Sequence, residues 1–473
     1  MKKNLIFILA DQFCFDLLDQ VGDLQLTNLQ QLRADSVSFD RCHTVNPVCS
    51  PSRASMLSAT YPHTHGMVDC THTVPQYRAD YDASLDTFTR VLKNSGYHMG
   101  YFGKWHIERT YHLEDYGFDE YETEDTLVQQ SRTVTKRITV NHETYEPLTL
   151  AAVYEKGAVT EEEYLMNRGI SFIEQAPKDQ PFGLFLSMYA PHDPYLCDEE
   201  MFATALAAKL PLPLNFNSPK EGRPNVYKRL REIWDVLSTE EIQEVIAIYH
   251  GFAKILDNQL GVLMTYLKEK GLYDDCTIVF TTDHGDAMGA HGCFNKSVMP
   301  IEESYHIPLL VKDSQLTPSR NQTLVQNMDI GPTVLDLLDL PSYSAPVDGV
   351  SLVPWAKGET DQPRSIMAEF HGLRYFYTQR IVWSEQYKYV FNAFDCDELY
   401  DLDADPYELK NLGQDPAYTP VVKQLCSKMW ELAEKSNDFT LLQAQYFTHR
   451  FAPVGPKCVS TSATVTGKFI KTV

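Results

Sequence analysis

Residues 5–12 read LIFILADQ and residues 277–286 read TIVFTTDHGD, so in each segment a short apolar run passes directly into acidic and polar residues. Apolar runs of this length are typical of strands buried on both faces of a parallel sheet. Three further runs have the same character and alternate with longer helical patterns, namely His98–Phe102, Gly183–Ser187 and Ile307–Lys312. The chain therefore predicts an α/β domain with a mostly parallel sheet flanked by helices.

The clearest helix is expected to begin at Ser238, because Ser238 and Glu241 have the spacing of a capping box and apolar residues follow at helical spacing as far as Leu263. After about residue 355 the pattern changes to successive antiparallel strands and then a helix. We expect these elements at Ile366–Phe370, Arg374–Trp383, Tyr387–Phe391 and Val421–Lys435. Two units follow from this change, a catalytic domain over residues 1–360 and a smaller C-terminal α+β subdomain over residues 361–473.

The composition limits the partners that the chain can bind. Its 473 residues carry 64 Asp and Glu against 41 Lys and Arg, a formal net charge of −23. A surface this acidic repels nucleic acids and anionic membranes, so neither is expected as a partner. The ten cysteines form no C-x-x-C pair, and the apolar stretch at residues 5–10 is too short for a secretory signal. A reduced cytoplasmic protein is therefore expected, and the sequence predicts no oligomeric state.

Charged and polar residues follow four of the predicted strands. In an open α/β sheet, groups just past the carboxyl ends of the strands meet in one crevice. Each ending alone is typical of a turn, a helix cap or a surface loop. Together they offer ligands for one divalent cation, and lysine and histidine for an anionic substrate. The four endings are Asp11-Gln12, Gly103-Lys104-Trp105-His106, Pro191-His192-Asp193-Pro194 and Asp283-His284-Gly285-Asp286.

The most specific segment is residues 46–57, NPVCSPSRASML. Cys49 lies just before a predicted helix, and Arg53 follows one turn later. The helix dipole and the guanidinium would stabilise a thiolate at Cys49. The alternative, a buried structural cysteine, is the better interpretation for most of the other nine cysteines.

The segment Cys49-Ser-Pro-Ser-Arg53 resembles the signature of the type I sulfatases, the formylglycine-dependent members of the alkaline phosphatase superfamily. Other landmarks of that family follow in the expected order over residues 4–412, among them GKWH at 103–106, PHDPY at 191–195 and TTDHGD at 281–286. The resemblance implies an alkaline-phosphatase-like fold with a C-terminal subdomain built on an antiparallel sheet. It also implies that a maturation enzyme oxidises Cys49 to formylglycine.

The resemblance further assigns roles by motif. Arg53 and Lys104 would hold the formylglycine diol and the sulfate, and Asp283 would help to deprotonate the attacking hydroxyl. His192 and Lys296 would neutralise the departing alcohol oxygen, and His106 would take the proton that releases sulfate. One cation, Ca²⁺ with Mg²⁺ as the alternative, would be held by Asp11, Gln12, Cys49, Asp283 and His284.

Three positions depart from the family pattern. Gln12 stands where many relatives carry Asp, His284 stands where some carry Asn, and Leu57-Ser-Ala-Thr60 replaces a common Leu-Thr-Gly-Arg. The alternatives to a sulfatase are a phosphonate or phosphate ester hydrolase of the same superfamily and a non-catalytic protein that binds sulfated ligands.

The substrate is expected to be a small sulfated saccharide, with choline sulfate as the alternative. An acidic surface would repel a long polyanion, and aromatic and hydrogen-bonding side chains suit a sugar. The side chains expected at the substrate rim are Trp105, Tyr195, His371 and Arg374.

Overall fold

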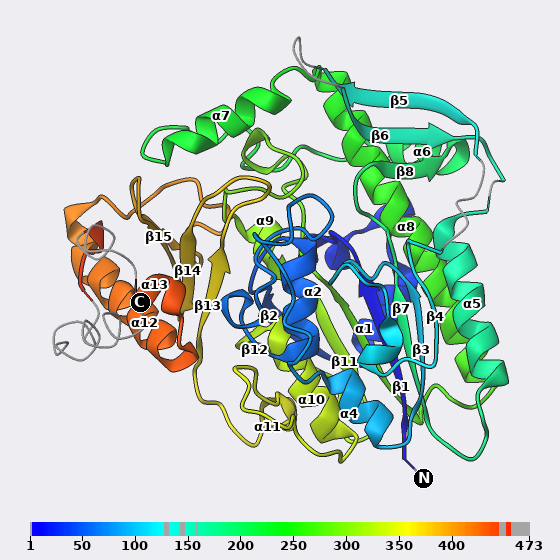
Figure 1. Ribbon diagram of the computed structural model, residues 1–473. Helices are drawn as coiled ribbons and strands as arrows, with labels where there is room; N and C mark the ends of the chain where they lie inside the picture. Colours follow the sequence, from blue (N-terminus) through cyan, green and yellow to red (C-terminus); the bar gives the residue numbers. More distant parts are fainter. Residues whose placement is uncertain (1, 127–131, 142–146, 158, 444–450, 456–473) are drawn as a thin grey trace.

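A computed structural model describes residues 2–126, 132–141, 147–157, 159–443 and 451–455 (Figure 1). A nine-stranded sheet runs through the centre of these residues. Its strands β9, β1, β7, β3 and β4 are parallel to one another in that order. The nine strands are β1 (Asn4–Ala10), β2 (Val37–His43), β3 (His98–Gly103), β4 (Glu120–Glu122), β7 (Phe182–Ser187), β9 (Cys276–Thr282), β10 (His306–Ile307), β11 (Leu309–Lys312) and β12 (Ser319–Gln326).

The mostly parallel α/β sheet predicted from the sequence is confirmed. Four of the five expected strands lie in the parallel core, each within one residue of its expected bounds. The fifth, expected over residues 307–312, is divided into β10 and β11 at Pro308, which has no N–H to donate. β11 runs antiparallel to β9, so the parallel part of the sheet ends at β9 on this side.

Helices cover both faces of the sheet because its strands are apolar on both sides (Figure 1). Ile6 and Ile8 of β1 pack in one buried cluster with α1 (Thr27–Ala34), α5 (Glu161–Gln175) and α8 (Thr239–Glu269). The alternating residues Leu5, Phe7 and Leu9 pack on the other side, with α2 (Cys49–Ser58), α4 (Phe88–Asn94), α10 (Ile330–Leu337) and α11 (Val353–Ala356). The remaining helices of this part are α3 (Pro62–His65), α6 (Glu199–Ala207), α7 (Asn225–Trp234) and α9 (Glu302–Tyr305).

The capping box expected at Ser238 is confirmed. The Ser238 hydroxyl accepts a hydrogen bond from the Glu241 N–H, and the Glu241 carboxylate accepts from the Ser238 N–H at 2.8 Å. α8 continues to Glu269 and is the longest helix of the described residues. Among those residues, no helix is both long enough and apolar enough to cross a bilayer.

The C-terminal part forms the expected antiparallel sheet. Its four strands are β13 (Ser365–Phe370), β14 (Gln379–Ser384), β15 (Tyr387–Asn392) and β16 (Glu398–Asp401), and α12 (Thr419–Ser436) and α13 (Phe439–Leu442) follow. The strand expected from Arg374 begins only at Gln379, because Arg374 has a φ of +64°, outside the range of a strand. The boundary between residues 360 and 361 stays a prediction.

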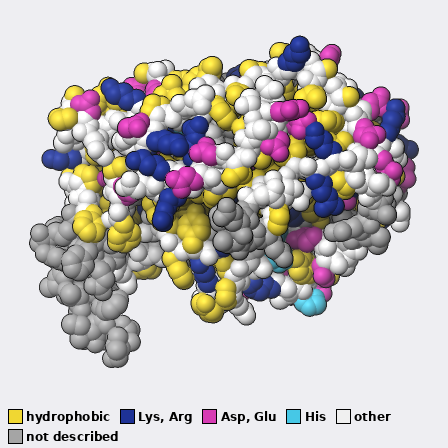
Figure 2. Space-filling model, turned by 90° about the horizontal axis from the view of Figure 1, so that it is seen from above, with side chains coloured by type: hydrophobic (Ala, Val, Ile, Leu, Met, Phe, Trp, Pro, Cys, Tyr) yellow, Lys and Arg dark blue, Asp and Glu magenta, His cyan; other side chains and the backbone are white. Residues whose placement is uncertain are grey.

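A small sheet that the sequence did not predict lies beside α8. It pairs β5 (Val134–Val140) with β6 (Leu148–Tyr154) and β6 with β8 (Tyr195–Asp198). β8 follows β6 only after the whole of α5 and β7, so no local pattern joins the two strands. Seen from above, this side of the molecule shows lysine and arginine side chains among acidic and apolar ones (Figure 2).

Gly103 ends β3 and allows β7 to lie close beside it. Its φ is +114°, and an added Cβ would lie 1.8 Å from the Ser187 carbonyl oxygen. Gly96 has a φ of +91° but leaves open space around an added Cβ. We expect Gly103→Ala to lower the free energy of unfolding by more than about 1 kcal/mol, and by more than Gly96→Ala does. Both variants force an alanine into a positive φ, but only at position 103 does the added Cβ also clash with a carbonyl oxygen. Urea unfolding of both variants measures this, and equal losses would show that the close approach of the strands is unimportant.

Candidate active site

The two parallel strands at the centre of the sheet bring two carboxylates together. β1 and β9 pair in register up to Ala10 and Thr282, so Asp11 and Asp283 leave the sheet side by side. Both side chains are fully buried. The next residue, Gln12, donates its N–H to Asp283 Oδ1 at 3.2 Å. The polar residues that follow β1 and β9 thus lie close together, as expected from the sequence.

Cys49 is the first residue of α2, a helix buried along its whole length. The preceding loop is held by Asn46, whose side chain accepts a hydrogen bond from the Val48 N–H at 2.9 Å. Cys49 Sγ lies 3.0 Å from His284 Nε2, 3.7 Å from Lys104 Nζ and 3.9 Å from Asp11 Oδ1. The cysteine singled out by its sequence context therefore lies where three of the strand ends converge.

Four side chains offer one ligand atom each within 4.8 Å of one another: Asp11, Cys49, Asp283 and His284. His284 Nδ1 lies 2.8 Å from the Gly285 carbonyl oxygen, which can only accept a hydrogen bond. Nδ1 therefore carries a proton, and Nε2 is the ring nitrogen that faces the group and that could bind a cation in the neutral imidazole. Two buried carboxylates beside an imidazole suit a divalent cation that prefers oxygen ligands.

Arg53 binds both carboxylates. It donates from Nε to Asp283 Oδ2 at 2.7 Å and from Nη2 to Asp11 Oδ2 at 3.0 Å. Its Nη1 donates to the Lys104 carbonyl oxygen and to Ser187 Oγ, both at 2.7 Å. Although burial opposes the charged form, Asp283 and Asp11 raise the pKa of Arg53 above its usual range. Arg53 thus orients the carboxylates, in addition to any contact with substrate that the sequence suggested.

Lys104 supplies the second buried cation. Its Nζ donates to Asp11 Oδ2 at 2.5 Å. Burial opposes ionisation of the Cys49 thiol, yet Lys104, Lys296 and His284 lower its pKa well below the usual range. Burial likewise would raise the pKa of Asp11, yet Lys104, His192 and Arg53 lower it. Lys104 therefore favours the charged forms of both Asp11 and Cys49.

His106 lies beside this group in a conformation that the loop enforces. Its φ is +52°, and its N–H donates to Glu124 Oε1 at 2.9 Å while the Trp105 N–H donates to Glu124 Oε2 at 2.6 Å. Burial and the nearby Lys104 lower the pKa of His106 to about 4. Its buried Nδ1 has no hydrogen-bond partner in the described part of the chain. A neutral histidine of this kind can accept a proton at pH 7.

His192 and Lys296 form a pair on the partly open side of the group. Lys296 Nζ donates to His192 Nε2 at 2.8 Å and to Gln12 Oε1 at 2.5 Å. His192 Nδ1 lies 2.5 Å from the Asp193 carbonyl oxygen, and its Nε2 lies 4.0 Å from Asp11 Oδ1. The structure thus places all of the expected catalytic and metal-binding residues in one neighbourhood.

Of the four side chains expected at the substrate rim, two are fully buried, a third contacts a buried carboxylate and the fourth is exposed. Trp105 is fully buried and donates from Nε1 to Glu108 at 2.9 Å, because aromatic residues pack around its ring. Tyr195 is also fully buried, and its hydroxyl donates to Asp286 at 2.6 Å. His371 lies 3.4 Å from the buried Glu369, in the junction with the C-terminal sheet. Arg374 is exposed and remains available to a substrate.

Two acidic residues, Glu124 and Asp286, accept hydrogen bonds from residues in or near the site, but no role was assigned to them from the sequence. Although burial opposes the charged form, His72, whose Nε2 lies 3.7 Å from Oε1, and the hydrogen bond from the Trp105 N–H lower the pKa of Glu124 to about 2. Glu124 follows His106 by 18 positions, so no local motif connects them. Asp286 is fully buried and accepts from Gln12, Tyr195 and two backbone N–H groups. Its place two residues after His284 was a signal that could have identified it.

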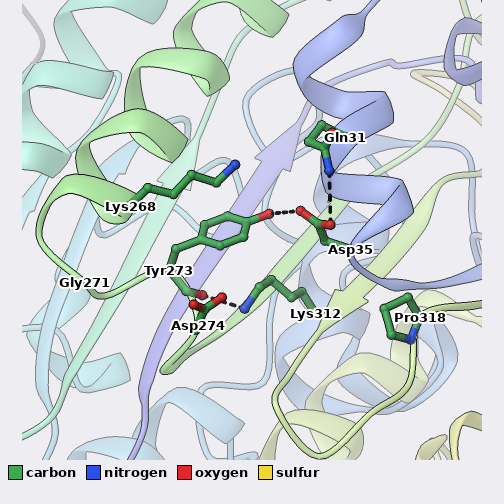
Figure 3. A pocket seen from close by; sticks show the side chains of 8 residues that line it. All are labelled: Gln31, Asp35, Lys268, Gly271, Tyr273, Asp274, Lys312 and Pro318. Atoms are coloured by element: carbon green, nitrogen blue, oxygen red, sulfur yellow. Dashed lines mark hydrogen bonds between the residues drawn. The ribbon is translucent and has the colours of Figure 1, made fainter.

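A separate hollow of about 550 Å³ lies near the start of β9, at the opposite end of that strand from Asp283 (Figure 3). Its lysines, Lys268 and Lys312, both lie 4.6 Å from the centre of the Tyr273 ring, and the Tyr273 hydroxyl donates to Asp35 at 2.8 Å. The negative charges of Asp35 and Asp274 offset the positive charges of the two lysines. The lining therefore favours neither an anionic nor a cationic ligand.

Comparison with known proteins gives two family matches. The model described as Sulfatase matches residues 3–340, and the model described as N-sulphoglucosamine sulphohydrolase, C-terminal, matches residues 289–435. The choline-sulfatase of Rhizobium meliloti (strain 1021) is 28% identical over 441 residues, which cover 88% of this chain and 83% of that protein.

Two solved structures have the same fold as this chain. The structure of BT4656 in complex with its substrate D-glucosamine-2-N,6-O-disulfate has a TM-score of 0.75 at 21% identity, over 93% of this chain and 99% of that one. The phosphonate monoester hydrolase of Agrobacterium radiobacter has a TM-score of 0.75 at 24% identity, over 92% and 96%. Because the model described as Sulfatase matches well over half of this chain's residues, the chain belongs to the sulfatase family.

Proposed function

We propose that this sulfatase hydrolyses a sulfate ester with a formylglycine made from Cys49 and one divalent cation. The observation that carries the proposal is the position of Cys49 Sγ, 3.0 Å from His284 Nε2 and in one buried group with Asp11 and Asp283. A structural cysteine would be surrounded by apolar side chains. Cys49 is instead surrounded by the charged groups that a reaction at an anionic ester requires.

The cation would be held by Asp11, Asp283 and His284, with the Gln12 amide oxygen as a supplement. Ca²⁺ is the expected ion, since carboxylate and amide oxygens suit it, and Mg²⁺ is the alternative. When bound, the ion would polarise the sulfate oxygens and the nucleophile. The fit rests on Asp11, Asp283 and His284, which together with Cys49 each offer one ligand atom within 4.8 Å of the others.

The formylglycine would come from a separate maturation enzyme, and its hydrate would supply the hydroxyl that attacks sulfur. Lys104 lies 3.7 Å from Cys49 Sγ, so its ammonium can neutralise negative charge on the sulfate. His106, whose pKa is about 4, is neutral at pH 7 and can accept the proton from the second hydroxyl.

The leaving alcohol oxygen would be neutralised by the His192 and Lys296 pair. Lys296 donates to His192 Nε2, so Lys296 carries the proton in this arrangement. Although burial opposes the charged form, Cys49, Asp193 and Asp11 raise the pKa of Lys296. The side chain of His192 is 24% exposed, whereas Asp11 is fully buried, so the pair faces the side from which an ester can enter.

The proposed substrate is a small sulfated saccharide. Exposed aromatic rings lie in two loops near the site, Tyr77 in the loop that carries Cys70 and Phe376 in the loop that carries Arg374. Cys70 Sγ lies 3.5 Å from His106 Nε2, and the Arg374 N–H donates to Asp69, so both loops adjoin the site. The Arg78 guanidinium lies 4.1 Å from the centre of the Phe376 ring and occupies one face of it, which disfavours a quaternary ammonium there.

The first prediction concerns Cys49. After expression beside a maturation enzyme, peptide mass spectrometry should show loss of sulfur at Cys49 and at no other cysteine. Cys49→Ala should reduce sulfate release to the background rate, because the nucleophile is missing. Cys276→Ala, a change at a buried cysteine at the start of β9, should retain activity. Full activity with an unmodified Cys49 would contradict the proposal.

The second prediction concerns the substrate. We expect kcat/KM to be higher for a sulfated monosaccharide than for choline sulfate, an aryl sulfate or a phosphonate monoester. Steady-state release of sulfate or phosphonate from the four compounds measures this. A preference for the phosphonate would favour the phosphonate hydrolase alternative, and a preference for choline sulfate would overturn the saccharide proposal. No turnover of any of the four by matured protein would favour a non-catalytic binder.

A further inference from the structure

The amide of Gln12 has neighbours of opposite character at its two ends. Its nitrogen Nε2 donates to Asp286 Oδ2 and lies 3.3 Å from Asp193 Oδ1. Its oxygen Oε1 accepts from Lys296 Nζ at 2.5 Å. A carboxylate offers only acceptors and an ammonium offers only donors. The chemistry of the neighbours therefore permits one orientation of the amide, with the oxygen toward Lys296.

The backbone of Gln12 is fixed independently of its side chain. Its φ is +63°, in the left-handed region that residues other than glycine rarely adopt. Its N–H donates to Asp283 Oδ1 at 3.2 Å, and its carbonyl oxygen accepts from the Tyr249 hydroxyl at 2.9 Å. Such a conformation persists where surrounding contacts enforce it, commonly at functional sites.

The two oxygens of Asp286 have separate partners. Oδ1 accepts from the Met288 N–H at 2.7 Å and from the Asn295 N–H at 2.9 Å. Oδ2 accepts from the Tyr195 hydroxyl at 2.6 Å and from Gln12 Nε2. The backbone contacts hold Oδ1 in place, so Oδ2 always faces Gln12.

We propose that Asp286 is a positioning residue that sets the orientation of the Gln12 amide, with its oxygen toward Lys296 and its nitrogen away from it. The inference rests on the proposed function, in which the Gln12 oxygen supplements the cation ligands and Lys296 assists the leaving group. A reversed amide would place its NH₂ against the Lys296 ammonium and would withdraw the only ligand atom that the Gln12 side chain can offer.

The substitution Asp286→Asn tests this, because two backbone N–H groups would keep the Asn oxygen at the Oδ1 position. The new NH₂ would then face Gln12 Nε2, and the Gln12 amide would reverse so that its oxygen accepts from Asn. We expect the Kd for Ca²⁺ of the protein with unmodified Cys49, measured by isothermal titration calorimetry, to rise by about tenfold or more.

The double variant Gln12→Glu with Asp286→Asn separates orientation from a general structural role. A carboxylate at position 12 has an oxygen at both ends, so it accepts from the new Asn and still presents an oxygen to Lys296. Gln12→Glu alone would set two carboxylates against each other. We therefore expect the double variant to bind Ca²⁺ more tightly than either single variant, whereas a merely structural Asp286 would make the double variant bind more weakly than Gln12→Glu alone.

Two further variants complete the experiment. Asp313→Asn changes another buried carboxylate with several donors, which accepts from Lys3 at 2.5 Å and Thr277 at 2.6 Å, and it should bind Ca²⁺ like the parent. Asp11→Asn tests the proposed cation site itself and should weaken binding. Parent-like binding by Asp286→Asn while Asp11→Asn is weak would overturn the role of Asp286 and leave the proposed function standing. Parent-like binding by Asp11→Asn would instead overturn the cation site.

Discussion

The guanidinium of Arg53 lies between the carboxylates of Asp11 and Asp283, and it is fully enclosed by protein. Two buried carboxylates at the ends of neighbouring strands would repel each other strongly. Arg53 compensates this repulsion and fixes both groups through its planar fork. Because Arg53 is one turn after Cys49 on α2, one helix places both the reactive residue and the cation that organises its neighbours.

The local charges contrast with those of the whole chain. The net charge is −23, yet Lys104 and Lys296 both lower the pKa of Cys49, which lies in the buried group. Interactions between exposed charges fade over about 8–10 Å in physiological salt, whereas buried charges are screened far less. A single sulfate group can therefore be attracted at the site while the outer surface repels a long polyanion. This contrast agrees with a small substrate.

Much of the fold and of the site could be predicted from the sequence, because both depend on local patterns. The apolar runs that end in Asp11 and Asp283 identify the strands and their polar ends, and the context of Cys49 identifies the helix start. Side-chain burial could not be predicted in this way. Trp105 is adjacent to site residues in the sequence and Tyr195 is close to one, but both side chains are fully buried, and Glu124 reaches His106 through tertiary packing alone.

The most direct test of the account is the Ca²⁺ binding isotherm of Arg53→Lys compared with the parent, on protein whose thermal unfolding shows that it is folded. A lysine keeps the charge but cannot bind Asp11 and Asp283 together. The account predicts one site per chain in the parent and a Kd at least about tenfold higher in the variant, as is usual when a residue that orients metal ligands is lost. Binding of equal affinity in both proteins would contradict the claim that Arg53 organises the site.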